Sequence, residues 1–269
     1  MNLAAYAIEA EVEETHWWFV GRRVLFGREI AGLGLSREAS ILDVGTSTGT
    51  NLRMLADLGF LHVVGLDISD EAIRFCAEKG LGVVRPGDIC DLPFEDASLD
   101  LVLATDLIEH VDDDRLALSE IARVLVPGGN AVITVPAFQS LWGLQDEVAH
   151  HLRRYRLPML RNAIEAVGLR PVRCFHFNYL LFLPIWFARQ ILRVFDIKIS
   201  SESQVNTRLL NRLLRRVFDL DVQTAPWLAP PFGVSIFLLA EKPAVSEVAA
   251  TIPVRADSQP QYTETRRAA

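Results

Sequence analysis

Residues 41–49 combine an apolar run with acidic and small residues at regular spacing. They read ILDVGTSTG, in which Asp43 precedes Gly45 by two positions and small residues follow at Ser47 and Gly49. A helical pattern of leucines starts directly afterwards. Small residues let the main chain approach a ligand closely, and free N–H groups at a helix start favour polar or anionic groups. The segment predicts a strand, a turn and a helix start that together cradle a small molecule.

The spacing of this loop differs from that of a dinucleotide-binding loop. The pattern GxGxxG would need glycine at 47 and 50, where the chain has Ser47 and Thr50. A carboxylate at Asp43 would also repel a pyrophosphate and attract an ammonium or sulfonium group. A cationic small molecule is therefore the preferred ligand, and a nicotinamide-dependent reductase is the less favoured alternative.

Three further segments follow in register. HVVGLDIS (62–69) places Asp67 at the end of a second strand, GDICDLPFEDASLDLVLATDLIEHV (87–111) carries several acidic residues, and RVLVPGGNAVITVP (123–136) gives a turn before a fifth strand. With D-x-G-x-S-x-G, these segments resemble the class I S-adenosylmethionine-dependent methyltransferases, whose first motif is typically D/E-x-G-x-G-x-G. Ser47 replaces the central glycine of that motif and is small enough for cofactor binding.

The resemblance implies S-adenosyl-L-methionine as the cofactor, held by anchors at three strand ends. Asp43, with the backbone of Gly45–Gly49, is expected to hold the methionine end, Asp67 the ribose hydroxyls, and Asp88 with Ile89 the adenine. The alternative for Asp67 and Asp88 is that they are ordinary turn or cap aspartates. The full predicted cofactor-binding set is Asp43, Gly45, Thr46, Ser47, Gly49, Asp67, Ile68, Asp88, Ile89 and Asp106.

The predicted catalytic residues are His110, His16 and Tyr155. His110 follows the fourth predicted strand, and a histidine there could accept a proton from a hydroxyl or amine acceptor because it titrates near neutrality. The alternative is that Glu109 and His110 fix the turn into the next helix. His16 belongs to a segment E…HWWF.GRR, which the resemblance places over the cofactor cleft as a lid. The alternative for that segment is aromatic docking on the core.

Arginines surround Tyr155 at positions 153, 154 and 156. Beside an acceptor pocket they could clamp a phosphate or carboxylate. The alternative is a set of surface ion pairs of little energetic weight.

No metal site is predicted. Asp146, Glu147, His150 and His151 are metal-ligating types, and Asp146 and His150 are four residues apart. Isolated Asp/His pairs are common, so a solvated loop is the favoured interpretation.

Alternating strand and helix patterns predict an α/β fold with a doubly wound parallel sheet. The resemblance implies seven strands with an antiparallel last strand, an N-terminal helical lid (1–35) and a methyltransferase domain (36–244). A basic, apolar helical insertion is expected over 178–222 and a disordered tail over 245–269. The expected strands are 40–46, 62–68, 82–87, 99–104, 130–135, 171–177 and 234–241, and the expected helices are 49–58, 114–125, 157–167 and 205–218.

The net charge of −7 gives no indication of a nucleic-acid binder, but its distribution is uneven. Residues 1–150 have 10 Lys and Arg against 25 Asp and Glu, whereas residues 151–220 have 13 against 4. This asymmetry points to an anionic partner for the basic segment. The three cysteines form no CxxC pair, and the N-terminus does not have the pattern of a signal peptide, so a cytoplasmic location is expected.

Residues 205–218 form a basic amphipathic pattern, with leucines on one side and Arg208, Arg212, Arg215 and Arg216 on or beside the other. With the apolar stretch before it, this region (179–218) could rest on the inner face of an anionic membrane or flank a lipid-phosphate acceptor. The alternative is a packed surface helix with a solvated arginine face, because most amphipathic helices are of this kind.

These observations predict methyl transfer from S-adenosylmethionine to oxygen or carbon of a small acceptor, with anionic, lipid-linked and saccharide acceptors all compatible. A catalytically inactive, cofactor-binding interaction protein is the main alternative, because Ser47 departs from the motif and the base is not defined by the sequence. The sequence does not define the oligomeric state.

Overall fold

The computed structural model describes residues 10–194 and 207–244. The first residues of the predicted lid, part of the predicted insertion and the predicted disordered tail lie outside the described residues.

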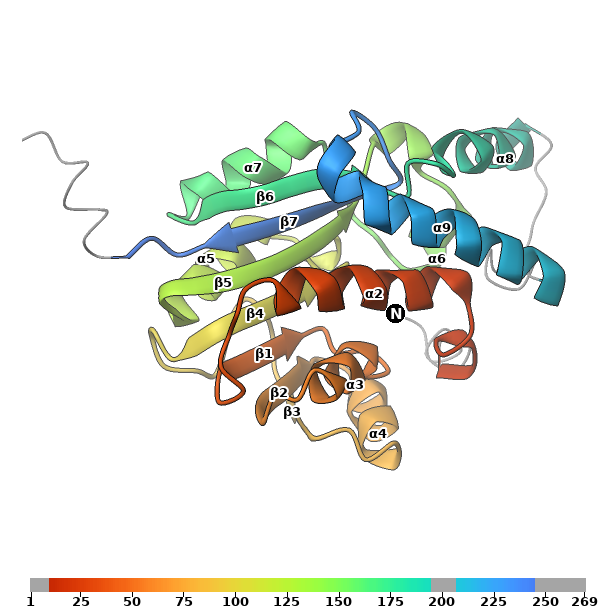
Figure 1. The fold of residues 1–269 in the computed structure, drawn as a ribbon. Coiled ribbons are helices and arrows are strands. Elements are labelled where there is room, and N and C mark those ends of the chain that lie inside the picture. Colours follow the sequence, from red (N-terminus) through yellow and green to blue (C-terminus); the bar gives the residue numbers. More distant parts are fainter. Residues whose placement is uncertain (1–9, 195–206, 245–269) are drawn as a thin grey trace, which may run out of the picture.

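One seven-stranded sheet runs through the molecule in the order β3-β2-β1-β4-β5-β7-β6 (Figure 1). Strands β1 to β5 pair in parallel, and β7 is antiparallel to both β5 and β6. The predicted doubly wound sheet with an antiparallel last strand is confirmed. The strands are β1 (Ser40–Val44), β2 (His62–Asp67), β3 (Val83–Pro86), β4 (Leu99–Thr105), β5 (Leu125–Pro136), β6 (Arg170–Phe177) and β7 (Ser235–Glu241).

Strand β5 begins five residues earlier than predicted. Leu125 already pairs with Leu99 of β4, and the register then shifts before Asn130 pairs with Leu101. Gly128, which has φ +85°, lies in this irregular stretch. The predicted Gly128–Gly129 turn is therefore a distortion within the strand rather than a break before it.

Helices cover both faces of the sheet. One buried cluster joins α2, α3 and α9 to the sheet, and the other joins α5 and α7 to the opposite face. The helices are α2 (Trp17–Ala31), α3 (Thr50–Asp57), α4 (Asp70–Glu78), α5 (Asp114–Val124), α6 (Leu144–Val148), α7 (Leu157–Ala166), α8 (Phe182–Val194) and α9 (Arg208–Leu228), with short 3-10 turns η1 (Ile108–His110) and η2 (Gln139–Leu141).

Helix α9 extends ten residues beyond the predicted end at 218, and its two halves differ. Phe218, Val222 and Ala225 in the second half are buried against the sheet. A Cβ atom at Gly21 of α2 would lie 2.2 Å from the ring of Phe218, so glycine is required for this close packing. The prediction ended the helix too early because the core-facing residues continue past the basic stretch.

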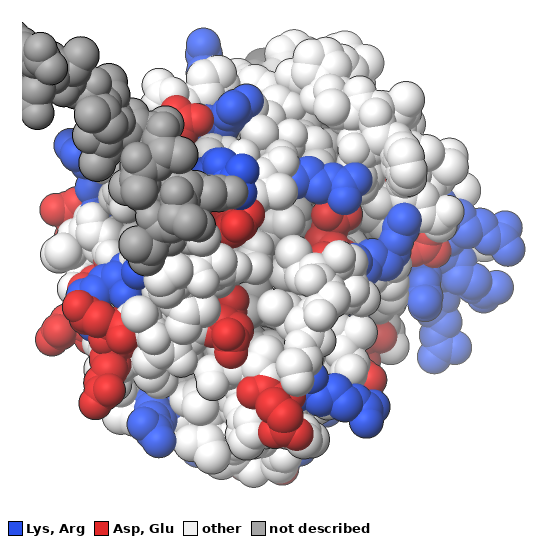
Figure 2. All heavy atoms as spheres, turned by 60° about the vertical axis from the view of Figure 1, so that its left-hand side comes forward, with Lys and Arg blue, Asp and Glu red and all other residues white. Residues whose placement is uncertain are grey.

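Charge is unevenly spread over the surface. In Figure 2 a group of basic side chains projects from the right-hand edge, whereas acidic side chains are scattered over the rest of this face. No described helix has the length and hydropathy needed to cross a bilayer.

Candidate active site

A cavity of about 830 Å³ opens at the carboxyl ends of the parallel strands. Its walls come from the loops after β1, β2, β3 and β4, from the start of α2, and from α8 and α9. Ligands of open α/β sheets bind at this edge, where the strand order reverses between β1 and β4. The cavity is therefore the candidate active site.

The loop after β1 is held in an unusual backbone conformation. Gly45 and Gly49 have φ of +72° and +87°, and Ser47 also has a positive φ of +51°. A Cβ at Gly45 would lie 2.8 Å from Cδ1 of Leu107, so a larger residue there would displace the loop after β4. Gly45 and Ser47 line the cavity. Thr46 is buried and donates its hydroxyl to the carbonyl of Asp43 at 2.9 Å, so it and Gly49 shape the loop from behind.

Asp67 lies at the end of β2 and faces the cavity. Its two carboxylate oxygens accept hydrogen bonds from the backbone N–H groups of Ser47 and Ser69, each at 2.9 Å. These bonds orient the carboxylate and leave further lone pairs for ligand hydroxyls. Ile68, Asp88 and Ile89 also line the cavity, and their contacts with the nucleoside stay a prediction.

Asp43 lies beneath the loop and does not line the cavity. Asn51 Nδ2 donates to its Oδ1 at 2.9 Å, whereas its Oδ2 is buried without a hydrogen-bond partner. Burial raises the pKa of Asp43 to about 7. The sequence analysis treated this group as a charged carboxylate, but in this environment it is partly protonated at neutral pH. A cationic ligand in the cavity would favour the ionised form of this carboxyl group, because a nearby opposite charge lowers the pKa of an acid.

The N-terminal segment before α2 contacts the loop after β1. The buried Glu13 carboxylate accepts hydrogen bonds from the hydroxyl of Thr48 and from Nζ of Lys79, the latter at 2.5 Å. Arg22 of α2 pairs with Asp106 at 2.7 Å, just after β4. These contacts join the segment to two strand ends of the cavity.

The aromatic residues of this segment contact both the core and the cavity. The rings of Trp17 and Trp18 pack against Phe218 at centroid distances of 5.2 and 5.3 Å, and both also line the cavity. His16 lines the cavity as well, and burial lowers its pKa. The element thus docks on the core and forms part of the cavity wall, and its role as a lid stays a prediction.

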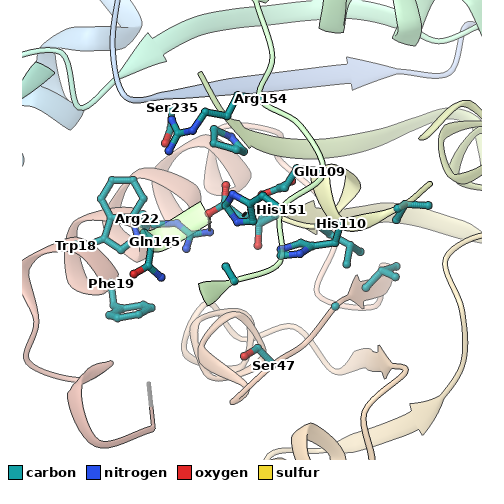
Figure 3. A pocket seen from close by; sticks show the side chains of 18 of the residues that line it. Trp18, Phe19, Arg22, Ser47, Glu109, His110, Gln145, His151, Arg154 and Ser235 are labelled. Atoms are coloured by element: carbon teal, nitrogen blue, oxygen red, sulfur yellow. Dashed lines mark ion pairs between the residues drawn. The ribbon is translucent and has the colours of Figure 1, made fainter. Parts of the chain in front are cut away.

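The opposite side of the cavity holds a cluster of titratable side chains. Glu109 and His110, from η1, lie beside His151, and Figure 3 shows the three together on the cavity wall. His151 Nδ1 is 2.8 Å from Asp146 Oδ1, and Arg154 Nε donates to the same oxygen at 2.7 Å. Burial acts to raise the pKa of Asp146, but these hydrogen bonds and the Arg154 charge lower it to about 2. Asp146 is therefore ionised at neutral pH.

His110 is the predicted base that this cluster contains. Burial, and then the neighbouring His151, lower the pKa of His110 to about 4, so its imidazole is neutral at physiological pH. Burial raises the pKa of Glu109 well above its usual value. The sequence analysis did not predict Glu109, Asp146 and His151 as site residues. It paired Asp146 with the exposed His150, whereas the left-handed φ of +58° at His150 turns the next residue toward Asp146.

Tyr155 lies outside the cavity. It is fully buried, and its hydroxyl donates to Asp114 Oδ2 at 2.7 Å. Burial, followed by the hydrogen bond to Asp114, raises its pKa, so deprotonation near neutrality is unfavourable. Arg153 also pairs with Asp114, at 3.2 Å. Of the predicted clamp arginines, Arg154 lines the cavity, whereas Arg153 and Arg156 do not. Arg22 of α2 and Arg189 of α8 also line it.

Comparison with known proteins identifies a methyltransferase domain in part of this chain. Residues 42–133, which include the loop after β1 and the strand ends of β2 and β4, match the family described as a methyltransferase domain. The chain is 36% identical to the O-methyltransferase rstn1 of Aspergillus nomiae over 104 residues, which cover 36% of this chain and 46% of that protein. It is 32% identical to a probable S-adenosylmethionine-dependent methyltransferase of Mycolicibacterium smegmatis over 124 residues, 46% of this chain and 47% of that protein. The matched part thus spans less than half the length of either relative.

Solved structures share the fold over a longer stretch. The structure of a putative sarcosine dimethylglycine methyltransferase from Galdieria sulphuraria has a TM-score of 0.57 and 19% sequence identity, and covers 84% of this chain and 86% of that chain. S-adenosylmethionine is the methyl donor of the matched family. Residues 42–133 thus carry a methyltransferase domain of the class I S-adenosylmethionine-dependent type, and the fold around them is shared with the solved methyltransferase structure.

Proposed function

We propose that the protein transfers a methyl group from S-adenosylmethionine to an oxygen of a small acceptor. The observation that carries this proposal is the layout of the cavity. Figure 3 shows Ser47 of the glycine loop below the cluster of Glu109, His110 and His151, and the ribose-binding candidate Asp67 is hydrogen-bonded to Ser47. The similarity to O-methyltransferases supports oxygen over the carbon acceptor that the sequence analysis also considered.

The bound cofactor would supply an electrophilic methyl carbon on a sulfonium. Asp67 would hold the ribose, and the main chain of Gly45 and Ser47 would receive the methionine portion. Glu109, His110 and His151 would lie beside the acceptor hydroxyl and assist the loss of its proton to water. Alignment of the methyl donor and the acceptor in a dry pocket contributes up to ~10 kcal/mol to such reactions. Trp17 and Trp18, on the part of the cavity wall that α2 contributes, would exclude water from the pocket.

Methyl transfer is tested by incubating the full chain with S-adenosylmethionine carrying a tritiated methyl group and a cell extract. The expected result is label in an extract component, with loss of transfer in Asp67→Ala. The variant Asp70→Ala, which changes an exposed carboxylate outside the cavity, is the matched control. If the wild type binds S-adenosylhomocysteine yet labels no fraction, the alternative of an inactive, cofactor-binding protein is favoured instead.

A membrane-associated acceptor is the second part of the proposal. On α8, Leu183, Phe187 and Ile191 follow one another at intervals of four residues and are 57%, 56% and 52% exposed. On α9, Leu209 and Leu213 are 75% and 59% exposed. The predicted apolar face of this helix is thus exposed at Leu209 and Leu213, whereas Phe218 farther along it is buried. Figure 1 places α8 and the first half of α9 at the same end of the molecule.

The charges beside this apolar surface fit an anionic bilayer. Arg208, Arg212, Arg215 and Arg216 are exposed and form no ion pair with the residues that the structure describes. The same two helices also contribute Ile185 and Leu210 to the wall of the cavity. Exposed apolar and basic side chains together bind anionic membrane surfaces. We infer that α8 and α9 rest on an anionic lipid surface and that the acceptor enters the cavity from it.

Vesicle sedimentation tests this inference. Binding to vesicles with anionic lipid should exceed binding to neutral vesicles and weaken with salt. Each neutralised arginine, as in Arg212→Gln or Arg216→Gln, should reduce partitioning about 5-fold, since one basic residue contributes about 1 kcal/mol. Arg161→Gln, an exposed arginine on α7, is the matched control. Equal binding to neutral and anionic vesicles, or no binding at low salt, would contradict the inference.

A further inference from the structure

Three potential metal ligands meet on the cavity wall. Glu109, His110 and His151 each present a ligand atom, and these atoms all lie within 4.8 Å of one another. Two of the residues come from η1 directly after β4, and the third comes from the loop before α7. The cluster lines the cavity, so an ion bound there would face the acceptor (Figure 3).

Glu109 is the clearest sign that a ligand belongs here. Its side chain has no solvent exposure, and neither carboxylate oxygen has a hydrogen-bond partner in the structure. The nearest ring nitrogen of His151 is 4.0 Å from Oε1, too far for a hydrogen bond. A buried carboxyl group without partners is costly, so an additional group that binds both oxygens would stabilise this arrangement.

His151 is oriented as metal-ligating histidines usually are. Its Nδ1 is hydrogen-bonded to Asp146 Oδ1 at 2.8 Å, which turns Nε2 toward Glu109. Asp146 is itself held by Arg154 and by the backbone N–H of Gly143 at 2.8 Å. A carboxylate behind the far ring nitrogen is the common supporting contact of a histidine that binds a metal. The ring centroids of His110 and His151 are 4.7 Å apart, and the two ring planes are nearly perpendicular.

We propose that Glu109, His110 and His151 bind one divalent transition-metal ion. Two imidazoles and one carboxylate suit Zn²⁺, Mn²⁺ or Fe²⁺ better than Ca²⁺, which prefers six or more oxygen ligands. Ligand atoms bound at about 2.1 Å to one ion lie roughly 3–3.5 Å apart, so side-chain shifts of about 1 Å complete the site. Three protein ligands leave a coordination position open to the cavity, as in catalytic metal sites.

The role of the ion in catalysis rests on the proposed methyl transfer. Binding of the ion to the three residues does not depend on that proposal. An acceptor hydroxyl bound at the open position would lose its proton to water more readily, because a divalent ion lowers the pKa of a bound oxygen acid. The resulting oxyanion would be held beside the methyl-donor side of the cavity.

The test is a titration of metal-free full-length protein, without cofactor, with Zn²⁺ and with Co²⁺ as a spectroscopic probe. We expect one ion per chain, a Co²⁺ spectrum of nitrogen and oxygen ligands, and at least a 10-fold loss of affinity in His151→Asn and in Glu109→Gln. Asp146→Asn should weaken binding about 10–100-fold through its support of His151. His150→Asn, at the exposed neighbouring histidine, should bind as the wild type does.

The proposal is overturned by no stoichiometric binding to the wild type, or by equal affinity in His151→Asn. A thiolate-to-cobalt absorption band would also overturn it, because it would place the ion at a cysteine. If a variant does not fold, the ligand type in the wild-type spectrum still decides. Binding of S-adenosylhomocysteine is measured separately, so failure of the metal site is distinguishable from failure of the methyltransferase proposal.

Discussion

The two sides of the cavity are built in different ways. On the glycine-loop side, Gly45, Ser47 and Asp67 lie within 23 residues of sequence, and main-chain hydrogen bonds hold them in place. On the histidine side, one main-chain hydrogen bond joins Leu152 to the carbonyl of Glu109, but the functional side chains are oriented by side-chain contacts, as in the pair of His151 with Asp146. Main-chain geometry is common to a whole fold, whereas side-chain networks can be exchanged one residue at a time. The difference suggests that the first side recognises the shared cofactor and the second side selects the acceptor.

The largest effect is expected from breaking the network on the histidine side. Asp146→Ala leaves Arg154 buried without its ionic partner, which should reduce the free energy of unfolding by about 3–5 kcal/mol. Urea unfolding measures this change. Glu147→Ala, at the exposed next position, should change it by less than about 0.5 kcal/mol. If Asp146→Ala unfolds like the wild type, the network does not hold this side together.

A smaller, separate effect is expected on the glycine-loop side. Asp67→Asn removes the charge that ribose hydroxyls would bind, and the affinity for S-adenosylhomocysteine should fall about 100-fold, since hydrogen bonds to a charged group contribute about 1.5–3 kcal/mol each. Calorimetric titration measures this loss. Asp70→Asn should bind as the wild type does, and His151→Asn should too if the two sides act independently. A comparable loss in His151→Asn would remove the distinction between them.

The pH dependence of Asp43 tests whether the glycine loop covers a partly protonated carboxyl group. Its pKa in the folded protein is raised to about 7, from an ordinary value of 3.8, so the folded state binds the proton more tightly than the unfolded state. Stability from this group is therefore greatest below pH 4 and is lost as the pH rises to about 7. Relative to Asp43→Asn, the wild type should lose on the order of 2–4 kcal/mol of unfolding free energy across this window. A difference between the two proteins that is constant with pH would contradict the buried environment.

The smallest effect concerns how the N-terminal segment is attached. Arg53 pairs with Glu14 at the surface, so Arg53→Ala should change the free energy of unfolding by less than about 1 kcal/mol. Lys79→Ala removes a partner of the buried Glu13 and should cost more. Hydrogen exchange of residues 10–16 should increase only in Lys79→Ala. The reverse order would show that the surface pair, rather than Glu13, holds the segment.

The sequence predicted the sheet and the glycine-loop side because their signals are local. The apolar runs that became β1, β2 and β4 end at acidic residues, and each strand lies within a few residues of its predicted bounds. The histidine side could not be predicted in the same way. Asp146 and His150 have helical spacing, but the short helix α6 ends before His150, and the turn brings His151 to Asp146 instead. Tyr155 was selected from its arginine neighbours, and only the three-dimensional structure shows that it points to Asp114.

The length of α9 was missed for a related reason. The arginines and leucines of 208–217 gave a strong amphipathic pattern, but the residues that bury against the sheet begin at Phe218. The pattern of exposed side chains therefore decided where the helix was predicted to end. The residue of α2 that packs against Phe218, Gly21, could not be known from the sequence.

A crystal structure of the protein grown with S-adenosylhomocysteine is the most direct test of the account. We predict that the ribose hydroxyls lie within hydrogen-bond distance of the Asp67 carboxylate and that the sulfur faces Glu109, His110 and His151. Density for the ligand outside this cavity, or a sulfur that points away from the histidine side, would contradict it.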